Sequence, residues 1–251
     1  MNFNVKKIAS AIALATASSF AAWDYYNIPE EHHGEARVRA HYWYNGDFHS
    51  TDFDVDARFT VVKGLEISLQ NLGYQFFAND HDGASGNNGF KDITVGLKYA
   101  FDPNLYAFID ANIPTGADEV TNNEFSLKTG VQWHLPITEQ FGIGNEFALT
   151  FPFKHDGGQH GGITADYGFE FYYAFKSGFT PFTGWVFTSQ LTDGRDADKK
   201  KSGTGSSNVS FWAGSSYAIN KHVTLTLFTD IEYAAHGAYY SGYIFQATFA
   251  F

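Results

Sequence analysis

The chain has 251 residues, 44% of them hydrophobic and 18% aromatic, with 25 Gly and no Cys. The absence of cysteine excludes a disulfide framework and thiol-ligated metal, and the formal net charge of −11 argues against a nucleic-acid partner, which requires a basic surface. No apolar run of about 18 residues follows the N-terminal region, so the sequence predicts no membrane-spanning helix, whereas its glycine and aromatic content favours β structure.

Residues 1–22 have the composition of a secretory signal peptide. A basic start with Lys6 and Lys7 precedes the apolar run IASAIALA and the small residues TASSFAA. This order predicts export with cleavage near Ala22, because the apolar run is too uniform for an amphipathic helix. Residues 23–34 show no clean period and are expected to form a short periplasmic N-terminal extension.

From residue 35 onward, segments of alternating apolar and polar residues follow one another to the C-terminus. In residues 52–62, Phe53 and Val55 alternate with Asp54 and Asp56, a period of two that a helix would not separate. Each segment is close to the length of about 9 to 11 residues that a tilted strand needs to cross a bilayer. Twelve such segments are predicted: 35–44, 52–62, 65–77, 92–101, 105–113, 124–135, 141–153, 164–175, 181–192, 208–219, 222–233 and 241–251.

Two of these segments are irregular. In residues 65–77 the apolar register changes near Gln70 and Asn71, and this change predicts a β-bulge. Residues 181–192 are the weakest strand, because Trp185 and Phe187 lie on one face while Phe182 lies on the other.

The connections between the segments alternate short and long without exception, the first long one being residues 45–51. Outer-membrane barrels have short periplasmic turns and longer external loops. The predicted fold is therefore all-β: a transmembrane antiparallel β-barrel of about twelve strands over residues 35–251, with both termini in the periplasm.

The apolar face is predicted to contact lipid. A soluble barrel would place that face inside, but here it carries almost no charge and has aromatic residues near both ends of the strands, as two membrane interfaces select. The polar face then lines the lumen.

The closing segment, residues 241–251, ends on an aromatic face that comprises Tyr243, Phe245, Phe249 and Phe251. It resembles the closing strand of bacterial outer-membrane β-barrel proteins, whose terminal Phe is read by the barrel assembly machinery. The resemblance implies that machinery, outer-membrane lipid and lipopolysaccharide as partners. A closed barrel also requires residues 241–251 to pair with residues 35–44, because open edges would be unsatisfied in hydrocarbon.

A second motif is more specific. Residues 95–101, VGLKYAF, lead through a tight turn to a strand at 105–113 and then to Pro-Thr-Gly at 114–116. This order resembles the outer-membrane transporter family linked to the phenol meta-cleavage pathway. The resemblance implies a barrel that passes small molecules, including apolar or aromatic ones, and it supplies no catalytic residues.

The charged residues of the polar face are the candidate lumen-lining residues. They are Arg37, Arg39, Asp54, Asp56, Arg58, Lys98, Asp110, Lys128, Glu146, Asp166, Glu170, Asp230 and Glu232. Two interpretations stay open: the charges line an acidic-mouthed passage for small solutes, or they pair across neighbouring strands and fill the lumen.

The leading hypothesis is an outer-membrane channel or passive transporter for small solutes. The alternative is a non-conducting structural or adhesive barrel that acts through its external loops. No enzyme is expected, since no strand places Ser and His together, and neither a cofactor nor a metal site is expected, since the His and Asp residues at 79–82 and 155–160 match no ligand template.

Overall fold

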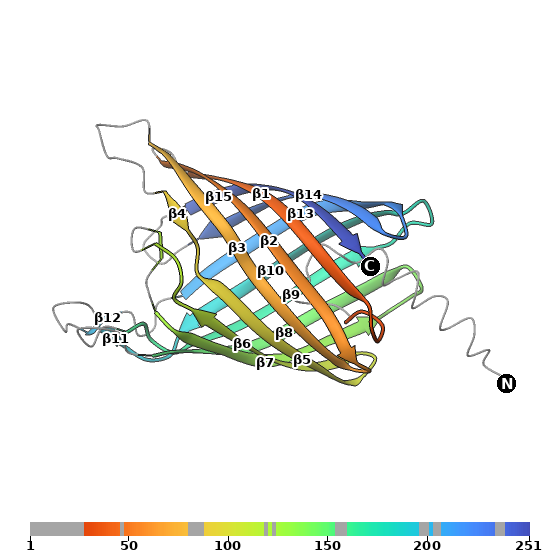
Figure 1. Ribbon diagram of the computed structural model, residues 1–251, viewed down its shortest axis with the longest axis horizontal. Helices are drawn as coiled ribbons and strands as arrows, with labels where there is room; N and C mark the ends of the chain where they lie inside the picture. The colour runs from red at the N-terminus through yellow and green to blue at the C-terminus, as the bar shows by residue number, and fades with distance from the viewer. Residues whose placement is uncertain are drawn as a thin grey trace.

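The computed structural model describes residues 28–45, 48–79, 88–117, 120–121, 124–153, 160–195, 201–202, 207–233 and 239–251. The predicted signal peptide lies outside these residues. Within the described part of the chain, twelve long antiparallel strands form one closed barrel (Figure 1), as predicted. They are β1 (Gly34–Asn45), β2 (Phe48–Val62), β3 (Leu65–Asn79), β5 (Ile93–Asp102), β6 (Leu105–Ile113), β7 (Ser126–Pro136), β8 (Phe141–Pro152), β9 (Thr164–Tyr173), β10 (Phe179–Gln190), β13 (Ser207–Asn220), β14 (Val223–Tyr233) and β15 (Tyr239–Ala250).

Three two-residue strands lie in the connections. Strand β4 (Gly89–Phe90) pairs with β3, and β11 (Gly194–Arg195) pairs with β12 (Lys201–Ser202). The sequence pattern did not predict them, because two residues carry no readable period. No helix of the described residues is long and apolar enough to span a membrane.

The first and last strands close the barrel. Strand β1 pairs with β15 from Glu35 opposite Ala250 to Tyr44 opposite Ser241, the predicted pairing, and it pairs with β2 on its other side. The ring is completed at its end by hydrogen bonds from the Gly34 amide to the Phe251 carbonyl and back, at 2.9 and 3.0 Å. Every barrel strand therefore has two hydrogen-bonded neighbours, which satisfies the backbone in a membrane.

The two faces of each strand have opposite environments. In β2 the side chains of Phe53 and Val55 are 51% and 44% exposed, whereas those of Asp54 and Asp56 are 3% and 0% exposed. The buried interior is thus polar and the exposed exterior apolar. Exposed aromatic side chains occur near both ends of the barrel: Tyr42, Phe53, Phe153, Tyr167, Tyr233 and Tyr243 at one end, and Tyr99, Phe101, Phe175, Tyr217, Phe249 and Phe251 at the other.

The predicted β-bulge is present in β3. Asp56 of β2 faces both Gln70 and Asn71, and Asn71 adopts a φ of 61°. The Asn71 amide donates a 2.7 Å hydrogen bond to Asp56 Oδ1, which fixes the extra residue. Because of the bulge, Ile67 and Leu72 both point outward, although they are five positions apart and a regular alternation would place them on opposite faces.

We call the end of the barrel with the short connections the turn end and the opposite end the loop end (Figure 1). The short connections comprise residues 63–64, 103–104, 137–140, 174–178 and 221–222. One predicted long connection is wrong: β1 and β2 stay paired as far as Asn45 opposite Phe48, which leaves only residues 46–47 between them. Ring contacts of His49 with Tyr42 and Tyr44 extend this hairpin beyond the predicted strand ends.

Candidate functional site

The half of the lumen next to the turn end is filled by side chains. On each barrel strand in this half, at least one inward side chain is at most 7% exposed, whereas a water-filled lumen would leave such side chains accessible. We call this packed set the plug. It includes Arg37, Arg58, Glu66, Lys98, Tyr106, His134, Glu146, Glu170, Phe182, Ser216, Thr226 and Gln246.

One side of the plug, on β1, β2 and β3, is charged. Arg58 lies between Glu35 and Glu66, with N–O distances of 2.7 and 3.3 Å, and Arg37 Nε lies 2.7 Å from Asp56 Oδ2. These pairs form because β1 and β2 place Glu35 opposite Arg58 and Arg37 opposite Asp56. Buried charges of this kind persist only when they are paired. We call these five residues the charged sector.

Further ion pairs continue from the charged sector towards the loop end. Arg39 contacts Asp56 at 3.2 Å and Asp54 at 3.8 Å, and Lys91 contacts Asp54 at 3.0 Å and Asp52 at 3.4 Å. Lys91 was not among the predicted lumen residues, because it precedes β5 in a segment without alternation. No sequence signal connects it to residues almost forty positions earlier.

The other side of the plug, on β9, β10, β13 and β14, is aromatic. Tyr172 and Phe182 are 6% and 5% exposed, and Trp212 and Phe228 pack against them. The Phe182 and Phe228 rings meet edge to face with centroids 6.0 Å apart. These rings point into the lumen. Because Phe182 is one of them, β10 has apolar residues on its inner as well as its outer face. We call these four residues the aromatic sector.

Inward glycines let side chains on non-adjacent strands meet inside the aromatic sector. Trp212 on β13 donates a 2.6 Å hydrogen bond from Nε1 to Glu170 on β9, and Gly184 of the intervening β10 lies opposite both residues. A Cβ at Gly184 would lie 2.5 Å from the Trp212 ring. The hydrogen bond between Trp212 and Glu170 therefore depends on the absence of a side chain at Gly184.

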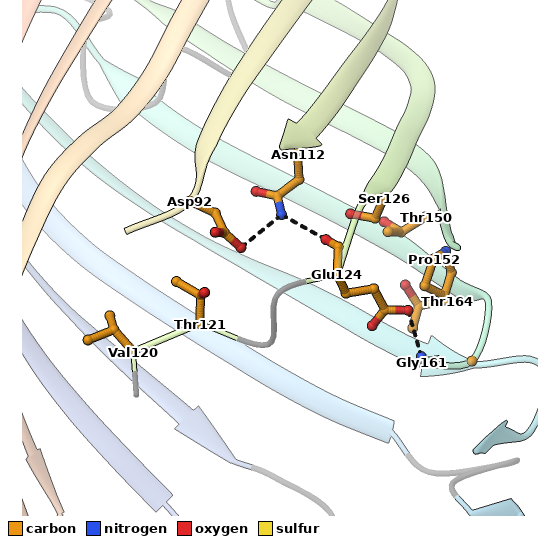
Figure 2. A pocket seen from close by; sticks show the side chains of 11 residues that line it. Asp92, Asn112, Val120, Thr121, Glu124, Ser126, Thr150, Pro152, Gly161 and Thr164 are labelled. Carbon is orange, nitrogen blue, oxygen red and sulfur yellow. Dashed lines mark hydrogen bonds between the residues drawn. The ribbon is translucent and has the colours of Figure 1, made fainter. Parts of the chain in front are cut away.

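The half of the lumen next to the loop end is open mainly beside β5 to β9, whereas on β2 the inward Asp52 and Asp54 stay buried. It contains an outer cavity of ≈ 370 Å³ and an inner cavity of ≈ 330 Å³, both lined in part by Asn112, Ser126 and Thr150. Figure 2 shows the outer cavity, where Asn112 Nδ2 donates to Asp92 at 3.4 Å and to the Glu124 carbonyl at 3.2 Å. The shared lining residues place the two cavities next to each other, and we call them together the hollow.

The inner cavity ends where the plug begins. Lys128 Nζ lies 2.8 Å from Glu146 and 3.6 Å from Asp166, and Gln132 donates a 2.7 Å hydrogen bond to Glu146. The Phe108 ring also lines this cavity, 5.8 Å from Lys128 Nζ. Lys128, which is 35% exposed, thus lies between the hollow and the plug.

The remaining predicted residues are spread over the lumen wall. Asp110 lines the inner cavity. Lys98 lies 5.0 Å from the centre of the Tyr106 ring, Asp230 lies 3.6 Å from His41, and Glu232 accepts a 3.2 Å hydrogen bond from Asn208. The thirteen candidates therefore divide between the plug, the hollow and the wall above them, and do not form one ring.

The Pro-Thr-Gly motif ties two strands together at the loop end. The amides of Thr115 and Gly116 donate to Asp92 Oδ1 at 3.1 and 2.9 Å, and the Ile93 amide donates to Thr115 Oγ1 at 3.2 Å. The motif thereby joins the end of β6 to the start of β5 and holds Asp92 at the outer cavity.

In the described ranges, no group of three or more His, Asp or Glu side chains is placed to hold a metal ion. Residues 80–82 and 155–159, which belong to the two loop segments weighed above as metal sites, lie outside those ranges.

A closed ring of antiparallel strands, an apolar exterior with aromatic side chains at both ends and a polar interior define an outer-membrane β-barrel. The chain belongs to the family described as "Putative MetA-pathway of phenol degradation", whose model matches residues 45–242. No curated protein matches the chain.

Solved structures share the fold at low sequence identity. An outer membrane channel from Pseudomonas putida F1 is 12% identical, with 93% of this chain and 100% of that chain covered and a TM-score of 0.69. The NanC porin is 14% identical, with coverages of 85% and 98% and a TM-score of 0.53. The β domain of the Bordetella autotransporter BrkA is 12% identical, with coverages of 88% and 100% and a TM-score of 0.55. Channels and an autotransporter domain thus share this architecture. The fold therefore does not distinguish these functions, and the function of this chain has to be inferred from its lumen.

Proposed function

We propose that the protein is an outer-membrane channel for the passive passage of small solutes, with its loop end outside and its turn end in the periplasm. The observation that carries this proposal is the hollow, whose two adjacent cavities extend from the loop end to Lys128 and Gln132 at mid-lumen. A barrel whose only role is structural needs no such hollow, because inward side chains stabilise it better when they are packed.

The electrical character of the hollow favours neutral and cationic solutes. Asp92, Glu124, Asp110 and Glu146 line it, with Lys128 as the one cation among its lining residues in the described part of the chain. Charged lining residues bias which ions enter a pore. The description of the family makes small apolar or aromatic molecules a solute class to test alongside simple cations.

The alternative is a non-conducting barrel that acts through its external loops. The packed plug favours it, since a closed lumen passes nothing. A channel must therefore open this plug, and the structure corresponds to its closed form.

Conductance in planar lipid bilayers separates the two functions. A channel gives discrete openings with a reversal potential that favours cations over anions, and it swells liposomes in isosmotic solutions of permeant solutes. A folded barrel, identified by heat-modifiable migration in gels, that stays silent in both assays supports the loop-based function. Neither function involves catalytic chemistry.

The aromatic end of β15 supports a second proposal, recognition by the barrel assembly machinery. Tyr243, Phe245, Phe249 and Phe251 are 58%, 51%, 44% and 61% exposed on the outer surface. Replacing Phe251 with Ala should lower the amount of folded barrel in the outer membrane of an expressing cell. An unchanged amount of folded barrel would show that Phe251 is not needed for recognition by the assembly machinery. Lipopolysaccharide around the external loops remains a further expected contact.

A further inference from the structure

We propose that solutes cross the plug through the aromatic sector, and that Tyr172, Phe182 and Trp212 set the size of the solute that passes. This inference rests on the proposed channel function. In this proposal the aromatic sector of the plug opens and the charged sector stays closed.

The charged sector is the fixed part. Arg37 and Arg58 are each 4% exposed and each contacts a buried carboxylate at 2.7 Å, and the partners come from directly opposed positions on adjacent strands. Opening a path there would separate buried charges, which is strongly unfavourable unless other charges replace the partners. The bulge at Asn71 adds another hydrogen bond to Asp56.

The aromatic sector can open without separating ion pairs. Phe182 and Phe228 contribute ring packing, while the hydroxyl of Tyr172 lies 2.8 Å from His134 Nε2. Rotation of the Phe182 and Phe228 rings forfeits dispersion contacts, which are individually weak. Rotation of Tyr172 and Trp212 also breaks their hydrogen bonds to His134 and Glu170, but it separates no ion pair of the charged sector and leaves the backbone pairing of the strands intact. The energetic contrast with the charged sector places the opening on this side.

The backbone beneath the rings provides the space. Gly142 lies opposite Tyr172, Gly184 opposite Trp212 and Gly214 opposite both Phe182 and Phe228. A Cβ at Gly142 would lie 2.6 Å from the Tyr172 hydroxyl, and a Cβ at Gly214 would meet Phe228. When the rings rotate away, the volume that they occupied stays open, because glycine has no side chain to fill it.

The aromatic sector also continues the hollow. The inner cavity ends at Gln132, and His134 is the next inward residue on β7. His134 contacts Tyr172, whose neighbour across the strand pair is Phe182. His134 therefore lies between the inner end of this cavity and the aromatic sector.

Single-channel recording on the full barrel tests the inference with matched variants. Tyr172→Ala and Phe182→Ala shorten inward side chains, and Tyr173→Ala and Phe187→Ala shorten the same residue types on the outer face, where they are 41% and 46% exposed. We expect the inward variants to raise the conductance roughly twofold or more, and the size of the largest permeant solute in liposome swelling, while the outward variants match the native barrel. If Phe182→Ala does not fold, Phe182→Leu should give a smaller rise.

The double variant Arg37→Ser with Asp56→Ser tests the other side, because it removes both partners of this pair, while Arg39 keeps Asp54 as a partner at 3.8 Å. If it raises the conductance and the aromatic variants do not, the inference is overturned and the channel function stands. If the native barrel and every variant are silent although folded, the channel function itself fails, and the inference with it.

Cysteine labelling gives a second, independent measurement, because the native chain has no cysteine. The Phe182→Cys variant should react with a small water-soluble methanethiosulfonate that then reduces the current, whereas the same reagent should not change the current of the Phe187→Cys variant. A current that is insensitive to the reagent at position 182 would place the path elsewhere.

Discussion

The imidazole Nε2 of His134 lies 2.8 Å from the hydroxyl of Tyr172, although the two residues are on β7 and β9, which are not neighbours. Strand β8 runs between them and presents Gly142 at the contact, where a Cβ would lie 2.7 Å from His134 Nε2. Glu170 and Trp212 meet in the same way beside Gly184. These two contacts of the barrel interior thus cross a strand at a glycine, whereas the ion pairs of the charged sector join adjacent strands.

Replacing Gly142 with Ala should lower the free energy of unfolding by about 1–3 kcal/mol, since the added methyl group overpacks a filled lumen. Urea unfolding of the barrel in detergent, followed by tryptophan fluorescence, measures the change. The double variant with Tyr172→Phe should recover part of the loss, because the hydroxyl is the atom nearest to the new Cβ, at 2.6 Å. An equal loss in both backgrounds would contradict the contact.

Neutralising Arg37 alone should cost about 3–5 kcal/mol of stability, because Asp56 is 0% exposed and would keep a buried charge whose remaining partners, among the residues that the structure describes, are Arg39 and the Asn71 amide. Arg37→Met with Asp56→Leu should cost less than Arg37→Met alone. The same unfolding assay compares the two variants with the native barrel.

Neutralising Arg37 and Arg58 together should leave the reversal potential of folded channels unchanged, since both are buried in ion pairs away from the hollow. Bilayer recording in a salt gradient measures this quantity. A shift in selectivity would mean that the charged sector lines the conducting path.

Neutralising carboxylates that line the hollow should change the reversal potential. Asp92→Asn with Glu124→Gln removes two negative charges from the outer cavity while amide oxygens still accept hydrogen bonds from Gly116 and Gly161. The reversal potential should move towards anions, because charged lining residues select ions electrostatically. The control is Asp102→Asn, whose carboxylate accepts from Asn104 at a short turn, away from the hollow.

A charge on the outer face should destabilise the barrel according to its depth. Phe245→Arg, near the middle of β15, should cost about 2–4 kcal/mol in a lipid bilayer, and Phe251→Arg, beyond the end of the same strand, about 0–1 kcal/mol. Unfolding in lipid vesicles measures both. Equal costs would show that the apolar outer face is not embedded as a membrane span.

The strands were predictable because each one repeats a local pattern. The alternation of Phe53 and Val55 with Asp54 and Asp56 defines which side chains point inward, and the change of register at Asn71 marks the bulge. The first hairpin was predicted too short, because His49, Ser50 and Thr51 are consecutive polar residues and so do not continue the alternation.

The sequence by itself determined the fold class, the twelve strands and the pairing of residues 241–251 with the first strand, since a period of two needs only neighbouring residues and a closed barrel needs every edge paired. Only the tertiary structure decided that the turn half of the lumen is packed and the loop half contains the hollow. The reason is that packing depends on side chains from strands far apart in the chain, such as Lys91 with Asp52, His134 with Tyr172 and Glu170 with Trp212. Whether such residues meet is set by the curvature of the closed ring and by the glycines between them, and neither is visible in the alternation of a single strand.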